Sequence, residues 1–373
     1  MGKKGKERAK ERRRQRLEEI AELREVPYSP SERWWSGETA AVVTGANRGI
    51  GLEIARQLAA HGLRVVLAAR DAERGRAAAE RLREEEGLCV EPRQLDVTDS
   101  ASVDAFANWV SSEYGGIDIL VRTAYVMLAW HIPICEAHNL QFEDIRGARD
   151  VKQLFSNVLN SIFGCLALYL CSIMSQVNNA GVNFNTGADN SVESAEEVIA
   201  TNYFGTKRMI KAMIPIMKPS PFGARILNVS SRLGRVNGRR NRVGDEALRE
   251  RLLQDDCLSE ELIDGMVTKF LEQVKLGTWS LNGWPQMYTD YSLSKLAVNA
   301  YTRLIAKRIL DKPEGEKIYI NCLCPGWVKT AMTGWAGNIS AEEAADTGVW
   351  VVLLPPEKAP NGKFFAERRE ISF

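Results

Sequence analysis

The sequence predicts an α/β fold in which a doubly wound parallel sheet (a Rossmann fold) forms a single domain with two insertions. From Thr39 onward, short runs of Val, Ile, Leu and Ala alternate with amphipathic segments of helical length. Such runs are typical of parallel strands that helices cover on both faces of the sheet. A glycine-rich turn directly after the first run is the second observation that favours this fold.

Composition places the chain among globular proteins and argues against a nucleic-acid partner. The 373 residues are 45% hydrophobic and 26% charged, with a net charge of +1. Nine of the first 16 residues are Lys or Arg and only two are acidic, so the rest of the chain is mildly acidic. An acidic body is a poor surface for nucleic acid. We interpret residues 1–37 as a basic flexible tail and residues 38–373 as the folded domain.

The cysteines and the N-terminus indicate the compartment. The seven cysteines include no C-x-x-C pair and mostly lie in apolar runs, as buried thiols in a reducing compartment do. The charged N-terminus is not followed by the apolar stretch of a secretory signal. We therefore expect a cytoplasmic protein that does not bind a membrane.

The order of the elements follows from the apolar pattern. Residues 50–60 place apolar side chains on one helical stripe, and residues 72–86 are predicted as a charged surface helix that Gly87 ends. A further helix is predicted from Tyr291 to Leu310. The five apolar runs are the expected strands, at residues 40–43, 64–69, 117–120, 224–229 and 318–322.

The turn after the first strand has the glycine spacing of a phosphate-binding turn. Gly45 permits the tight turn, Gly49 lets the backbone approach a pyrophosphate, and Gly51 allows close packing of the helix. The helix that follows offers free N–H groups and the positive end of its dipole to phosphate. We predict that a dinucleotide contacts this turn through Gly45, Asn47, Arg48, Gly49, Ile50 and Gly51.

The end of the second strand indicates which dinucleotide binds. Ala69 stands where an NAD-dependent enzyme usually has a carboxylate for the ribose 2′-OH. Arg70 and Arg48 instead suit a 2′-phosphate, so the predicted cofactor is NADPH/NADP. Asp71 could still reach a ribose, but we favour its interpretation as the cap of the helix that begins at Ala72.

Tyr291 and Lys295 form the candidate proton-transfer pair. They are one helical turn apart and so lie on the same face of the predicted helix. A phenol with an ordinary pKa near 10 exchanges protons poorly at neutral pH unless a nearby cation stabilises its phenolate. Lys295 supplies that cation, which makes the pair suited to acid–base catalysis.

Together these motifs resemble the short-chain dehydrogenase/reductase family, specifically the carbonyl reductase-like branch that includes plant menthone and salutaridine reductases. The resemblance implies an NADP-dependent oxidoreductase that acts on CH-OH and C=O groups. The matching segments follow the family's order from about residue 40 to the C-terminus: TGANRGIG at 44–51, LDVTD at 95–99, VNNAG at 177–181, TNYFGT at 201–206, ILNVSSRLG at 226–234, YSLSK at 291–295 and CPGWVKT at 324–330.

The resemblance also implies a role for each matching residue. Tyr291 would protonate the carbonyl oxygen of the substrate, and Lys295 would lower the pKa of Tyr291 and bind the nicotinamide ribose. Ser231 would hydrogen-bond the same oxygen, with Ser230 as the less favoured choice. Asn202 would hold a water that links Lys295 to solvent. The remaining cofactor contacts would come from Asp96, Val97, Asn178, Val328 and Thr330.

A first insertion precedes the catalytic tyrosine. Fifty-nine residues separate Ser231 from Tyr291, and the extra segment covers about residues 237–283. In the resembled branch a similar insert covers the face that other members use to dimerise, which implies a monomer; the alternative is a surface decoration. Three apolar residues near the expected pocket mouth suit either a small hydrophobic carbonyl substrate or core packing, namely Trp284, Met287 and Trp327.

A second insertion, residues 121–176, interrupts the fourth strand. In the resembled pattern Leu120 would run directly into Val177 and Asn178. Lengthening a loop is cheap, about 0.6 kcal/mol per doubling. The position is the larger problem, because either Val121 or Val177 must complete the strand while Asn178 still reaches the cofactor.

Three interpretations of residues 121–176 compete. A membrane span within residues 153–176 conflicts with several polar side chains, and a metal site at Cys135 and His138 lacks further ligands. The third comes from the genetic code, since Val-Arg can be encoded GTA-AGA and Gln as CAG, the two ends of a spliceosomal intron. We hypothesise a retained intron or a mispredicted gene model; long-read transcripts that contain only the 373-residue coding form would contradict it.

The sequence thus predicts an NADPH-dependent reductase of a ketone or aldehyde. The alternative is a related protein that binds the cofactor but is catalytically inactive because of the insertion at residues 121–176.

Overall fold

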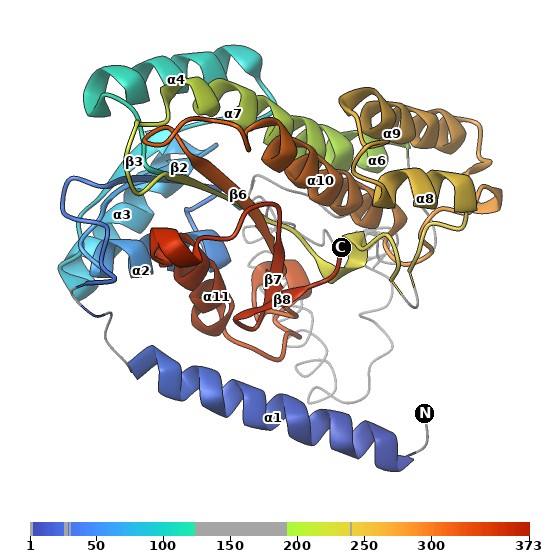
Figure 1. The fold of residues 1–373 in the computed structure, drawn as a ribbon, viewed down its shortest axis with the longest axis horizontal. Helices are drawn as coiled ribbons and strands as arrows, with labels where there is room; N and C mark the ends of the chain where they lie inside the picture. Colours follow the sequence, from blue (N-terminus) through green and yellow to red (C-terminus); the bar gives the residue numbers. More distant parts are fainter. Residues whose placement is uncertain (1–2, 26–28, 30, 124–191, 239–240) are drawn as a thin grey trace, which may run out of the picture. The chain divides into compact units, whose positions relative to one another are not determined.

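The computed structural model describes residues 3–25, 29, 31–123, 192–238 and 241–373, which all lie in one compact unit. Its sheet has the strand order β3-β2-β1-β4-β5-β6-β7-β8 (Figure 1). Neighbours from β3 to β7 are parallel, and β8 is antiparallel to β7, so the predicted doubly wound sheet is confirmed. The strands are β1 (Ala40–Thr44), β2 (Arg64–Ala69), β3 (Val90–Gln94), β4 (Ile119–Arg122), β5 (Ala224–Val229), β6 (Ile318–Leu323), β7 (Phe364–Ala366) and β8 (Arg369–Ile371).

Helices cover both faces of the sheet because its central strands are apolar on both. In β1, Ala40 and Val42 belong to one core cluster, whereas Ala41 and Val43 belong to the other. The first cluster is completed by α4, α7, α9 and α10, and the second by α2, α3 and α11. The helices are α1 (Lys3–Glu25), α2 (Gly49–Ala60), α3 (Ala72–Glu86), α4 (Ser100–Tyr114), α6 (Val192–Ile199), α7 (Gly205–Met213), α8 (Glu246–Leu253), α9 (Glu260–Lys275), α10 (Thr289–Arg308) and α11 (Ala341–Leu353).

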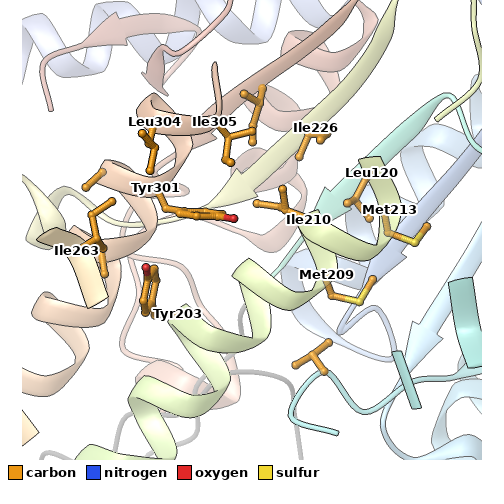
Figure 2. Close-up of a cluster of buried hydrophobic side chains, with 14 of the residues drawn as sticks. Leu120, Tyr203, Met209, Ile210, Met213, Ile226, Ile263, Tyr301, Leu304 and Ile305 are labelled. Carbon is orange, nitrogen blue, oxygen red and sulfur yellow. The ribbon is translucent and has the colours of Figure 1, made fainter. Parts of the chain in front are cut away.

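Part of the first cluster appears in Figure 2. Tyr301 of α10 packs edge-on against Tyr203, with ring centroids 6.1 Å apart, and Ile210 of α7 reaches toward Ile226 of β5. Tyr203 belongs to a π-helical turn, Ala200–Phe204, that joins α6 to α7. This packing fixes α7 and α10 against the sheet. The turn before α7 contains Asn202, and α10 contains Tyr291 and Lys295.

Local capping explains where α3 begins and ends. The Asp71 side chain accepts a hydrogen bond from the Arg74 N–H at 3.1 Å, and Gly87 adopts the left-handed conformation with φ 67°. Both features are as predicted.

In its described residues, the insertion that precedes Tyr291 contains the helices α8 and α9. Apolar residues of α9, including Ile263, Val267 and Phe270, are fully buried and belong to the same cluster as α10. Ser259 caps α9 by accepting a hydrogen bond from the Leu262 N–H. The segment is therefore part of the core as well as of the surface.

Three strands, β3, β7 and β8, are absent from the five predicted runs, and β4 has different bounds. The polar strand β3 escapes the apolar-run criterion because it lies at the sheet edge, where Pro92 and charged neighbours are tolerated. The fourth strand continues beyond Leu120, with Val121 paired to Val43 and Leu227, and Arg122 paired to Thr44 and Asn228. Residues of the predicted 121–176 insertion therefore complete β4.

The structure describes part of the first 37 residues, the expected basic flexible tail. Residues 3–25 form α1, in which Ile20 is buried, and the Arg13 Nε lies 3.4 Å from a carboxylate oxygen of Glu367. Trp34 and Trp35 belong to the second core cluster. The folded part thus begins before residue 38. Among the described residues no helix is both long and apolar enough to cross a membrane.

Candidate active site

The glycine turn between β1 and α2 has the geometry that the sequence predicts. Gly45 and Gly49 adopt φ of 60° and 58°, a region that side chains disfavour. A Cβ on Gly51 would lie 2.5 Å from the Gly45 carbonyl oxygen, so only glycine fits there. The turn lies at the carboxyl end of β1, beside β4, where the strand order reverses and such sheets bind nucleotides.

Charged residues flank this turn. Arg48 immediately precedes α2 in an extended conformation, and Arg70 follows β2. Burial raises the pKa of the Glu197 carboxyl, and the positive charge of Arg70 opposes that shift, which places Arg70 in the electrostatic neighbourhood of α6. Asp71 is engaged as the α3 cap.

Asp96 and Val97 follow β3. Asp96 accepts hydrogen bonds from the N–H and hydroxyl of Thr98, which hold this loop in a tight turn. Val97 is buried, and its carbonyl accepts a hydrogen bond from Arg208 at 2.6 Å. The loop is therefore tied to α7.

A cavity of about 90 Å³ joins the ends of four segments of the fold. The predicted residues Ser231 and Tyr291 both line it, as do Ile50, Trp327, Val328 and Thr330. Ser230 lies there too, but its hydroxyl points to the Lys295 carbonyl at 3.3 Å. The other lining residues are Val229, Leu233, Tyr288, Pro325, Gly326, Met332 and Thr333.

Lys295 lies behind Tyr291. Its Nζ is 5.5 Å from the centroid of the Tyr291 ring and donates to the Val229 carbonyl at 3.0 Å. Burial, followed by the nearby charge of Arg122, lowers the pKa of Lys295 to about 7. The predicted pair is therefore brought together, with the lysine almost wholly inside the protein.

Asn202 is linked to the tyrosine through Ser294. The Asn202 Nδ2 donates to the Ser294 Oγ at 3.0 Å, and that hydroxyl donates to the Tyr291 carbonyl at 2.7 Å. The Asn202 carbonyl accepts a hydrogen bond from Thr206 at 2.6 Å. These contacts with Ser294 and Thr206 hold Asn202 in place within the π-helical turn. The side chains of Asn202, Ser294 and Thr206 are all buried.

The three predicted apolar substrate residues lie in different surroundings. Trp327 lines the cavity and is 47% exposed, as befits a residue at its mouth. Met287 is also exposed but is not a lining residue, and its backbone is held by Asn241. Trp284 is buried in the core, where its indole N–H donates to Gln273 at 2.6 Å and its ring packs against Phe270.

Two residues of this region escape sequence reasoning. Tyr288 lines the cavity with φ 47°, a strained conformation for a bulky residue, and nothing in its local pattern signals this. Asp290 is fully buried beside the tyrosine, and its Oδ1 accepts the Tyr291 N–H at 2.6 Å. A carboxylate directly before an apolar helical segment is the signal that could have found Asp290.

The end of β4 is occupied by Arg122 and Thr123. Asn178, predicted to contact the cofactor, lies outside the described residues, as do Cys135, His138 and the uncharged segment 153–176. Thr123 donates from its hydroxyl to the Thr44 carbonyl beside the glycine turn. Arg122 is buried next to Lys295.

Comparison with known proteins gives one consistent result. A model of the family described as short chain dehydrogenase matches residues 39–176 and 143–243. The (+)-neomenthol dehydrogenase of Arabidopsis thaliana is 34% identical over 336 residues, covering 89% of this chain and 97% of the relative. Carbonyl reductase (NADPH) 1 of Mus musculus is 32% identical over 337 residues, covering 90% and 98%.

Solved structures agree with the sequence comparison. Salutaridine reductase from Papaver somniferum has a TM-score of 0.65 and 33% identity, covering 88% of this chain and 99% of that one. Menthone neomenthol reductase from Mentha piperita has a TM-score of 0.62 and 32% identity, covering 88% and 98%. With the glycine turn, the Tyr–Lys pair and the sheet order in place, the chain belongs to the short chain dehydrogenase family of oxidoreductases.

Proposed function

We propose that this protein is an NADPH-dependent reductase of a ketone or aldehyde. The observation that carries the proposal is the single cavity that Ser231 and Tyr291 line together, with Lys295 buried directly behind the tyrosine. The names of the relatives support the reaction class and the cofactor, because one of them is an NADPH carbonyl reductase.

The residues around the glycine turn fit a dinucleotide. Gly51 keeps the space beside the Gly45 carbonyl open, and α2 presents its N-terminus there. Arg48 and Arg70 are the groups that would hold a 2′-phosphate, while Asp96, Val97, Val328 and Thr330 would contact the rest of the cofactor. A bound NADPH would supply a hydride at the cavity; orientation and proton supply belong to the protein.

The side chains divide the work of carbonyl reduction. The Ser231 Oγ accepts the Leu233 N–H at 3.1 Å, which leaves its own proton available to a substrate oxygen. Tyr291 would donate a proton to the same oxygen. Lys295 would stabilise the phenolate that remains on Tyr291. The Asn202–Ser294 hydrogen bond would hold the π-helical turn against the start of α10.

The lining favours a hydrophobic substrate. Leu233, Met332, Trp327 and Val328 present apolar surface around the two hydroxyl groups. An apolar cavity with a few convergent polar groups is the usual form of a small-molecule site. We also expect a monomer, since the insertion helix α9 packs its apolar residues in the same core cluster as α10. A cytoplasmic location remains an expectation from the sequence.

A second function is favoured by one observation. Arg122 is a buried guanidinium whose positive charge disfavours the charged form of Lys295. If this effect prevents catalysis, the protein binds the cofactor without turnover.

Tyr291→Phe tests the proposed function. We expect the full chain to oxidise NADPH in the presence of hydrophobic ketones, and the variant to lose at least about a hundredfold in kcat because the acid is gone. NADPH affinity, followed by fluorescence titration, should stay within a few fold. Tyr319→Phe removes a phenol from β6 outside the cavity and is the matched control. Binding without turnover in the unaltered chain would favour the second function; full turnover by Tyr291→Phe would refute the mechanism.

A further inference from the structure

Arg122 is a buried cation with unusual surroundings. Its side chain is 1% exposed, and no carboxylate within the described ranges lies at ion-pair distance from it. Its Nη2 donates to the Thr201 carbonyl at 3.0 Å and its Nη1 to the Thr123 carbonyl at 3.3 Å. Among the residues that the structure describes, its buried Nε has no hydrogen-bond partner. Burying a guanidinium without a paired carboxylate costs free energy of folding. The cost suggests that Arg122 has a role that a neutral side chain could not fill.

The contact with Thr201 leads directly to the site. Thr201 and Asn202 are consecutive residues of the π-helical turn Ala200–Phe204. Such turns interrupt the regular ladder of helical hydrogen bonds, so a carbonyl within one is free to take an outside donor. Arg122 provides that donor from β4, while the next residue of the turn, Asn202, donates to Ser294 of α10.

Positive charges face Arg122 from the neighbouring elements. Arg208 of α7 opposes the protonated form of Arg122, and Arg122 in turn opposes the protonated form of Lys295 of α10. Burial, followed by the charge of Arg208, lowers the pKa of Arg122 to about 9. At neutral pH Arg122 therefore stays charged and acts on Lys295 as a like charge.

A second buried arginine shows what Arg122 lacks. Arg225 in β5 is 2% exposed, donates to the carbonyls of Phe222 and Gly223, and stacks over the rings of Trp34 and Tyr319 at 4.9 and 4.5 Å. It is well packed and lies outside the cavity. For the described part of the chain, Arg122 has no such aromatic partner. The two residues share burial and charge, but among the described contacts only Arg122 donates to the turn that carries Asn202.

We propose that Arg122 is a positioning residue of the reductase site, which anchors the turn that carries Asn202 and sets the range of pH over which Lys295 stays protonated. This rests on the proposed function. Arg122 belongs to the segment that follows Leu120, and it pairs with Asn228 of β5.

The groups that face Lys295 from each packed element determine the expected pH effect. They are Tyr291 on its own helix, Arg122 on β4, the Val229 carbonyl on β5 and the thiols of Cys322 and Cys324 at β6. Burial raises the pKa of Cys322 to about 12, so this thiol stays neutral and leaves the like charge of Arg122 unbalanced. Removing that charge should let Lys295 hold its proton to higher pH.

Three variants of the full chain test this role. Arg122→Met removes the charge and the donor, Arg122→Lys keeps a charge and a donor, and Arg225→Met removes the other buried guanidinium. We expect Arg122→Met to move the alkaline limb of the kcat/KM profile for ketone reduction upward by about one pH unit. Arg122→Lys and Arg225→Met should leave the limb where it is, although Arg225→Met should lower the melting temperature.

A second readout does not need turnover. The lowered pKa of Lys295 means that the unfolded chain binds more protons than the native chain above about pH 7, so this group makes stability rise with pH. We expect the rise in melting temperature between about pH 7 and 8.5 to be flatter in Arg122→Met than in Arg122→Lys. Equal slopes, together with an unmoved alkaline limb, would overturn the role of Arg122. If the unaltered chain has no turnover, the proposed function fails while the slopes still decide the role.

Discussion

At the residue scale, the two arginines at the glycine turn set the expected choice of cofactor. Arg70 follows Ala69, which stands where an NAD-dependent relative would have a carboxylate, and the adjacent acid Asp71 is used as a helix cap. A charge-assisted hydrogen bond from Arg70 to a 2′-phosphate would contribute about 1.5–3 kcal/mol to the binding free energy.

Arg70→Ala should therefore lower the preference for NADPH over NADH by tenfold or more, because a loss of roughly 1.4 kcal/mol of binding free energy lowers affinity tenfold. The measurement is the ratio of the two dissociation constants from fluorescence titration. Arg81→Ala, an exposed arginine on α3, is the matched control and should leave the ratio unchanged. An unchanged ratio in Arg70→Ala would show that the 2′-phosphate is held elsewhere.

At the element scale, the helix that follows the glycine turn depends on close approach to it. A Cβ on Gly51 would meet the Gly45 carbonyl at 2.5 Å and the Thr123 Oγ1 at 2.7 Å, so the helix start would have to move. Gly51→Ala should cost at least tenfold in NADPH affinity, because the phosphate-binding backbone moves with it. Titration measures the loss.

Gly265→Ala provides the control for Gly51→Ala. Gly265 lies within α9, where an added Cβ meets nothing within 4 Å. Alanine should raise stability there by up to about 1 kcal/mol through its helix propensity and leave affinity unchanged. Equal NADPH affinity in both variants would contradict the close-approach interpretation of the turn.

The elements also show what sequence reasoning reaches. Apolar central strands, the α3 caps and the Tyr–Lys face follow from local rules, and the structure contains all of them. The edge strand β3 could not be predicted from local rules, because its polar residues are tolerated only at the edge of the sheet. Trp284 was equally compatible with core and pocket, and only the packing of α9 places it in the core.

At the scale of the whole molecule, the interrupted fourth strand decides how far the family's pattern extends to this chain. The sequence left open whether Val121 or Val177 completes the strand, and local rules could not choose because both are valines followed by a polar residue. In the structure Val121 and Arg122 pair on both sides, with β1 and β5. The consequence is a buried arginine where the resembled pattern has an asparagine.

Deleting residues 121–176 reverses that substitution. Leu120 would then be followed by Val177 and Asn178, so an asparagine would enter the position that Arg122 holds. We expect the shortened chain to bind NADPH and to show an alkaline limb shifted upward in the same direction as Arg122→Met, because the same charge is lost.

The most direct test compares kcat/KM for NADPH-dependent ketone reduction in the full 373-residue chain and in the chain without residues 121–176. We expect turnover from both, with Tyr291→Phe abolishing it in each. Turnover by the shortened chain alone, while the full chain binds NADPH and leaves every ketone unreduced, would contradict a competent reductase site in the protein.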